Sequence, residues 1–213
     1  MPILAAFSHH DDALDWAQNR ATDFWGPVAL ASPRFEFTET DYYEPTMGPG
    51  LRKCFWAFER LADPQELVEW KLQANRWEEE FAELHCASAG EKGTVPFCSE
   101  DSAKGDSPRP SRGGQAPFAP SAAADKKEPV PESRPLNLDP GYLTAAKLVL
   151  ASTKDHSHRL YLAEGIYAEV TLYYRDGRWQ PREWTFPDYR RADYQEFFNA
   201  ARRLLRQAVG RLS

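Results

Sequence analysis

The segment KDHSHR, residues 154–159, brings two imidazoles, an ammonium and a guanidinium together within six residues. Side chains two positions apart in an extended chain lie on the same side, so His156 and His158 can approach one ligand together. With Lys154 and Arg159 they would bind a phosphate or a carboxylate. A solvated helix-to-strand connection is an equally favoured interpretation. Two imidazoles without a third ligand are a weak metal signal, so we predict no metal site.

Residues 137–153 hold further candidates. Asp139 followed by Pro140 is a frequent helix start, and the spacing of the later apolar residues predicts a helix ending near Thr153. The free amides and the positive end of such a helix suit an anion. We therefore include Asn137, Asp139 and Lys147, two turns along, as ligand-binding candidates. The simpler role for Asp139 is that of a cap and turn.

Two more groups come from a strand and a loop. In the predicted strand around 165–174, period-two geometry places Tyr167 and Glu169 together on one side. A shielded Glu169 could act as a general base, with His158 as a second catalytic candidate; the alternative is a charge on a solvent-facing strand. Tyr42 and Tyr43 lie in TDYYEPTMGPG, an irregular stretch typical either of a binding loop or of a structured crossover.

The elements that would position these groups alternate along the chain. We expect strands near 3–7, 28–37 and 51–60, a helix from Ser8 or Asp11 to Trp25, and a helix that starts at Asp63 with Pro64 and Glu66 behind it. After the helix predicted from Asp139 we expect three strands with turns at Glu164-Gly165 and Asp176-Gly177, and then a final helix near 192–211.

The order predicts an α+β fold with a largely antiparallel sheet and helices on one face. The first half suits a ferredoxin-like start whose missing edge strand the second half would supply.

Composition divides the chain into three parts. Residues 87–135 are rich in Pro, Gly and Ser and lack apolar periodicity, which predicts a disordered insertion. Residues 1–86 and 136–213 are then the two halves of one composite domain, since each half alone offers a marginal core.

Charge and hydropathy exclude several classes of protein. The formal net charge is −6, which makes nucleic-acid binding and adhesion to anionic membranes unfavourable. No apolar run reaches the ~20 residues of a membrane span, and the first residues do not resemble a secretory signal. We expect a cytoplasmic protein.

Several irregular motifs carry a family resemblance. They are TDYYEPTMG (40–48), FERLADPQELVEWKLQAN (58–75), NLDPGYL (137–143), KLVLASTKDHSHRLYL (147–162), GIYAEVTLYY (165–174) and WTFPDYR (184–190). They are similar to the bacterial family described as domain of unknown function 4416, and the similarity spans nearly the whole chain outside the insertion. Members are sometimes labelled GTP-binding, but this sequence has no G-x-x-x-x-G-K-[ST] and no G-x-G-x-x-G after a strand.

The sequence thus predicts a binding protein or enzyme for a phosphorylated or carboxylated small molecule, with a nucleotide as one candidate. The alternative is a non-enzymatic protein-interaction module that uses the sheet face and the 40–50 loop. The sequence identifies no cofactor and does not decide whether a reaction takes place.

Overall fold

The computed structural model describes residues 1–39, 43–90 and 134–211. The elements follow in chain order: β1 (Pro2–Ser8), α1 (Asp11–Trp25), β2 (Val28–Ala31), β3 (Phe35–Glu36), α2 (Glu44–Met47), β4 (Arg52–Phe58), the 3₁₀ turn η1 (Pro64–Glu66), α3 (Leu67–Gly90), β5 (Asn137–Leu143), β6 (Lys147–Ser152), β7 (Leu160–Ala163), β8 (Ile166–Arg175), β9 (Arg178–Pro181), the 3₁₀ turn η2 (Pro187–Arg190) and α4 (Ala192–Gly210).

The strands form one antiparallel sheet in the order β2-β4-β1-β5-β6-β8-β7, with β3 beside β4 and β9 beside β8. The predicted α+β class with an antiparallel sheet is confirmed. The strands β1, β2, β4 and β5 with α1 and α3 have the order and connections of a ferredoxin-like unit, and β5, from the second half, is its fourth strand. Strands β6 to β9 extend this unit.

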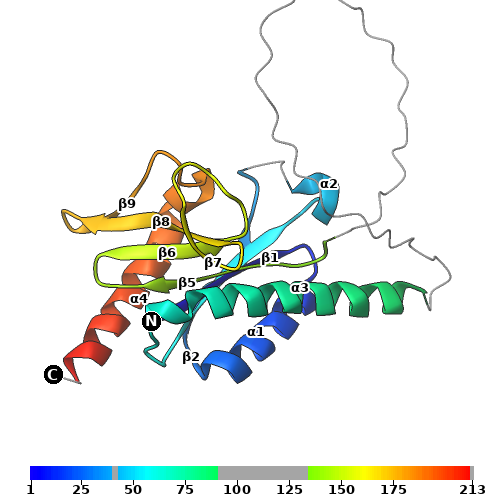
Figure 1. Ribbon diagram of the computed structural model, residues 1–213, viewed down its shortest axis with the longest axis horizontal. Helices are drawn as coiled ribbons and strands as arrows, with labels where there is room; N and C mark the ends of the chain where they lie inside the picture. Colours follow the sequence, from blue (N-terminus) through cyan, green and yellow to red (C-terminus); the bar gives the residue numbers. More distant parts are fainter. Residues whose placement is uncertain (40–42, 91–133, 212–213) are drawn as a thin grey trace, which may run out of the picture.

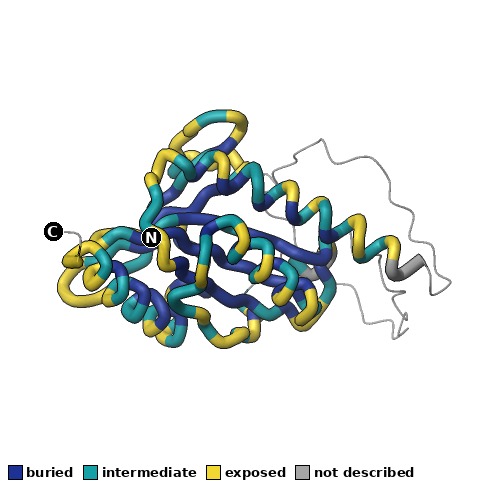
Figure 2. The backbone as a smooth tube through the Cα atoms, turned by 90° about the horizontal axis from the view of Figure 1, so that it is seen from below, coloured by how far each residue is buried: buried dark blue, intermediate teal, exposed yellow. Residues whose placement is uncertain are grey.

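Helices cover both faces of the sheet, which corrects the prediction of helices on one face. Along β1, Leu4 and Ala6 pack with α1 and α3, whereas Ile3 and Ala5 pack with η2 and α4. Every residue of β1 is buried because both sides of this central strand are covered. Figure 1 shows α1 and α3 together on one side of the sheet, and Figure 2 shows that the buried residues concentrate in the strands.

The helix predicted from Asp139 to Thr153 is wrong, because this segment forms β5, a turn and β6. Asp139 and Pro140 lie inside β5, so no helix N-terminus is present there to bind an anion. The capping box predicted at Asp63 is confirmed: its side chain accepts from Gln65 N at 2.9 Å, and Glu66 accepts from Asp63 N at 3.1 Å.

A few residues at each end of the predicted insertion 87–135 are described. The helix α3 continues to Gly90, and at the other end the Pro135 carbonyl accepts a 2.6 Å hydrogen bond from Ser8 Oγ. The remainder of 87–135 lies outside the described residues. Within the part of the chain that is described, no helix has the length and apolar character needed to cross a membrane.

Gly141 yields a direct test of the sheet. A Cβ at this position would lie 2.2 Å from the Val149 carbonyl oxygen on β6, so we expect Gly141→Ala to lower the free energy of unfolding by roughly 2–4 kcal/mol. Gly210→Ala, where nothing lies within 4 Å of the added carbon, is the control and should leave stability unchanged or slightly raised. Equal urea midpoints for the two variants would contradict the close β5–β6 approach.

Pairing between the two halves yields a second test. We insert a protease site after residue 105 of the full chain and expect the cleaved fragments to elute together on size exclusion, because β1 and β5 pair from Pro2↔Tyr142 to Phe7↔Asn137. Uncleaved protein is the control. Fragments that separate and stay folded would contradict a single composite domain.

Candidate functional site

A charged cavity of about 80 Å³ lies where β5 and β6 diverge, and residues from both halves of the chain line it. Its basic side chains are Lys53, Lys71, Arg134, Lys154 and Arg159, and its carboxylates are Asp139, Glu169 and Asp188. We call this space the charged cavity. Aromatic side chains complete the wall: Phe7, Phe37, Tyr43, Phe186 and Tyr189.

The two strands diverge at Pro140. They pair from Gly141↔Leu150 to Leu143↔Leu148, and the ladder stops at the proline, which has no N–H to donate. Two side chains of α3 replace the missing strand. Glu78 Oε1 accepts from the Leu138 N–H at 2.6 Å, and Lys71 Nζ donates to the Leu138 carbonyl at 2.6 Å. Lys71 therefore reaches the cavity from the layer of helices that contains α1 and α3.

Asp139 is surrounded by positive charge. Lys71 Nζ lies 3.3 Å from its Oδ1, and Asn137 Nδ2 donates to its Oδ2 at 2.9 Å. Burial alone would raise the pKa of Asp139, but Lys71, Lys53 and Arg134 together hold that pKa below its usual value. Asp139 is thus a carboxylate at neutral pH and lowers the net positive charge around it.

Lys53 and Asp188 form a buried pair across 135 residues of sequence. The ammonium donates to Asp188 Oδ2 at 2.6 Å, and the two side chains are 5% and 1% exposed. Tyr189 contributes a ring face 4.4 Å from the Lys53 ammonium, and Phe37 contributes another at 5.1 Å. An ammonium held this way is desolvated and fixed in direction.

Glu169 lies on β8 and also lines the cavity. Arg159 Nε donates to its Oε2 at 2.7 Å, and His158 Nε2 lies 3.2 Å from the same oxygen. Arg159 is itself held by Ser152, whose Oγ accepts from Nη1 at 2.6 Å. Glu169 is 5% exposed, so the alternative of a solvent-facing charge on this strand is wrong.

Tyr189 supplies a donor that the described residues leave unused. Its hydroxyl is buried and has no hydrogen-bond partner among them. Burial, followed by the charge of Asp188, raises the pKa of Tyr189 well above its usual value, so the hydroxyl keeps its proton. A buried donor without a partner is costly, and a ligand that accepts a hydrogen bond would remove that cost.

The chain matches one family model, described as domain of unknown function (DUF4416), over residues 1–87 and 121–204. It belongs to this family. The matched regions of the DUF4416 chain contain every described residue that lines the charged cavity. No curated protein and no solved structure matches the chain.

The structure brings together most of the residues predicted from the sequence. Six of them line the charged cavity: Tyr43, Asn137, Asp139, Lys154, Arg159 and Glu169. His158 contacts Glu169, and His156 lies against His158 with ring centroids 5.7 Å apart.

Three other predicted residues are not placed there. Lys147 is exposed at the far end of β6 and opposite Tyr173 in the ladder, so it does not line the charged cavity. Tyr167 packs edge-to-face on Tyr161 of β7 instead. Tyr42 lies outside the described residues.

Sequence reasoning missed Lys53, Lys71, Arg134, Asp188 and Tyr189. Each has its partner far away in the sequence, so local spacing could not connect them. One signal was present: Lys53 stands in the apolar run KCFWAF, where a charge has to find a buried partner. No three His, Cys, Asp or Glu side chains in the described ranges are arranged to hold a metal ion.

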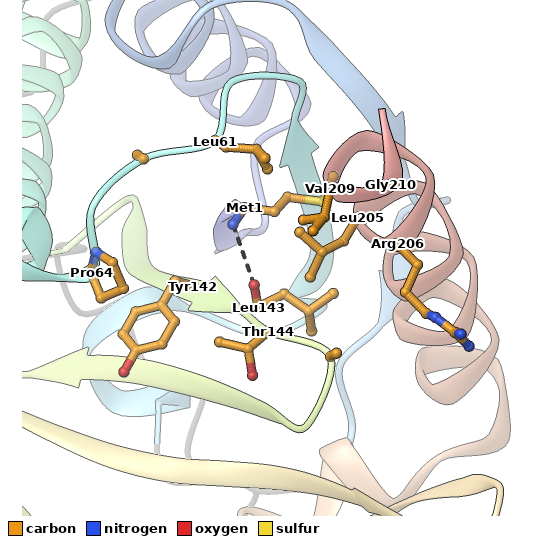
Figure 3. A pocket seen from close by; sticks show the side chains of 12 residues that line it. Met1, Leu61, Pro64, Tyr142, Leu143, Thr144, Leu205, Arg206, Val209 and Gly210 are labelled. Carbon is orange, nitrogen blue, oxygen red and sulfur yellow. Dashed lines mark hydrogen bonds between the residues drawn. The ribbon is translucent and has the colours of Figure 1, made fainter. Parts of the chain in front are cut away.

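A second cavity of about 570 Å³ lies between Met1 and the last turns of α4 (Figure 3). Its lining is mostly apolar and comes from Met1, the 61–64 loop, the β5–β6 turn and the end of α4. Arg206 is the charged side chain among the described lining residues, and Figure 3 shows it extending away from Leu143 and Val209. This apolar cavity is larger, but it has no carboxylate or imidazole in its lining, so we assign the chemistry to the charged cavity.

Removing one partner of the buried pair tests the charged cavity. Lys53→Met leaves Asp188 buried without its cation, and we expect the free energy of unfolding to fall by about 3–5 kcal/mol. The exposed pair Arg60–Glu66 is the control, since Arg60→Met should change stability by less than about 0.5 kcal/mol. The double variant Lys53→Met/Asp188→Leu should cost less than the sum of its single changes in urea unfolding. Additive losses would show that the two charges do not interact.

Proposed function

We propose that this protein binds a small molecule through a phosphate or carboxylate group held in the charged cavity. The observation that carries the proposal is the excess of cations: five basic side chains line the cavity against three carboxylates. Glu78, which accepts from Arg134 at 2.7 Å, adds one more negative charge nearby, and the cations still exceed the carboxylates. An anion entering this site would balance the remaining charge.

The ion pairs prepare the site for an anion. Four of the five cations are held in place by a carboxylate or a carbonyl, so they lose little side-chain freedom when a ligand binds: Lys53, Lys71, Arg134 and Arg159. A paired ammonium or guanidinium keeps further N–H donors, since lysine has three and arginine five. The Tyr189 hydroxyl adds a neutral donor that keeps its proton.

Glu169 and His158 are the groups we assign to any proton transfer. The carboxylate and the imidazole lie at hydrogen-bond distance, 3.2 Å, at one wall of the cavity. Such a pair can take up a proton from a bound substrate and release it to solvent through the ring. Binding requires only the cations, whereas a reaction would require this pair as well.

The protein-interaction module has less support. The central strands of its sheet face are covered by α1 and α3 on one side and by α4 on the other. In the 40–50 loop, Tyr43 packs against Phe7 with ring centroids 4.8 Å apart, and Met47 is buried. These two side chains of the loop therefore pack against the core rather than facing a partner.

Two buried tyrosines give a matched test with inorganic phosphate as the probe. Tyr189→Phe removes a hydroxyl in the cavity wall, and we expect phosphate affinity to fall about 10-fold or more while stability is unchanged or slightly raised. Tyr194→Phe removes another buried hydroxyl without a described partner, outside the cavity lining, and should leave affinity unchanged. Isothermal titration calorimetry gives the affinities and urea unfolding the stabilities.

Two lysines allow a second comparison in the same titration: Lys147, the first residue of β6, and Lys154, which follows the end of β6. Lys154→Ala should weaken phosphate binding roughly 5-fold, and Lys147→Ala, beyond the cavity, should not change it. Wild-type protein that binds neither phosphate nor small carboxylates at millimolar concentration would overturn the proposed function.

A further inference from the structure

The charged cavity is too small for a whole metabolite. Its volume is about 80 Å³, while pockets that enclose small molecules are typically ~300–1,000 Å³. It has room for an anionic group. If such a group occupies it, the rest of the ligand has to lie at the cavity mouth, and the side chains there decide which ligand fits.

Three aromatic rings are stacked next to the wall of the charged cavity. His158 lies nearly parallel to Trp184 and to His156, with interplanar angles of 12° and 13° and centroid distances of 5.2 and 5.7 Å. His158 also contacts Glu169 of the cavity wall, so the stack begins one hydrogen bond from the anion site. We call these three residues the aromatic stack.

The stack is fixed in position and reaches solvent. Trp184 Nε1 donates to the Val170 carbonyl at 3.3 Å, which sets the plane of the indole. Trp184 is nevertheless 40% exposed, and Phe186, which lines the cavity, is 42% exposed. Single exposed apolar residues are ordinary on protein surfaces. Two large exposed aromatic residues separated by one position, Phe186 in the cavity lining and Trp184 stacked on His158, form a surface for a flat ring.

We propose that the ligand is a nucleotide whose phosphate enters the charged cavity and whose base packs on the aromatic stack at Trp184. This inference rests on the proposed function and adds the class of ligand to it. Every base has a π-face, so stacking on an indole recognises a nucleotide and rejects a sugar phosphate without choosing between bases. Base identity would need hydrogen bonds to the base edge in addition.

The test compares three probes on the full chain by calorimetry: inorganic phosphate, ribose 5-phosphate and the four nucleoside 5′-monophosphates. We expect the nucleotides to bind roughly 5- to 100-fold more tightly than ribose 5-phosphate, as expected for one base stacked on an aromatic ring. Trp184→Leu should abolish that advantage and leave phosphate affinity unchanged. Tyr161→Leu, which removes a 62% exposed aromatic residue outside the stack, is the control and should retain the advantage.

If Trp184→Leu does not fold, tryptophan fluorescence of the wild-type protein and of Trp184→Phe replaces the calorimetric comparison. Nucleotides should quench the emission of the wild-type protein and not that of Trp184→Phe, which keeps a ring for binding. Equal affinities for phosphate, ribose 5-phosphate and nucleotides would overturn this inference and leave the proposed function standing. No binding of any phosphate would also overturn this inference, and the proposed function itself would fall only if small carboxylates did not bind either.

Discussion

The end of the β5–β6 ladder at Pro140 is the constraint on which the site depends. Beyond it, the N–H and the carbonyl of Leu138 have no β6 residue to pair with, although β1 still lies on the other side of β5. A buried backbone group without a partner costs about 1–3 kcal/mol. Glu78 and Lys71 of α3 satisfy both groups, each at 2.6 Å. The same lysine contacts Asp139, the next residue of β5. A defect in one ladder thus opens the cavity and brings a cation into it from another layer.

The cavity also joins the two halves of the chain. Lys53 from β4 pairs with Asp188 from η2, and Arg134 pairs with Glu78. Since these residues are far apart in sequence, the site exists only when β5 has paired with β1 and α4 has packed on the second face. We therefore expect a change that weakens the packing of either half to weaken the site.

Local patterns in the sequence predicted many of the elements. The capping box at Asp63 and the glycine turns at 165 and 177 depend on neighbours within a few residues, and both are observed. The alternation of β8 is interrupted by a register shift in its pairing with β6, so that Leu172 packs on the opposite face from Ile166. The segment 137–153 was misassigned because Asp139-Pro140 imitates a helix start and because a short apolar run such as 148–151 fits a helix or a buried strand equally well. Sequence reasoning identified Glu169, Arg159 and His158 because these residues are close in sequence. It did not identify the pairs Lys53–Asp188 and Lys71–Asp139, because only the sheet topology brings the two members of each pair together.

The most direct test of the charged cavity is a crystal structure of the full chain soaked with tungstate, a phosphate-shaped anion whose scattering locates it unambiguously. We predict that tungstate occupies the cavity within hydrogen-bond distance of Lys154, Arg159 or the Tyr189 hydroxyl. Tungstate bound elsewhere at saturating concentration, with the cavity empty and its ion pairs unchanged, would contradict the account.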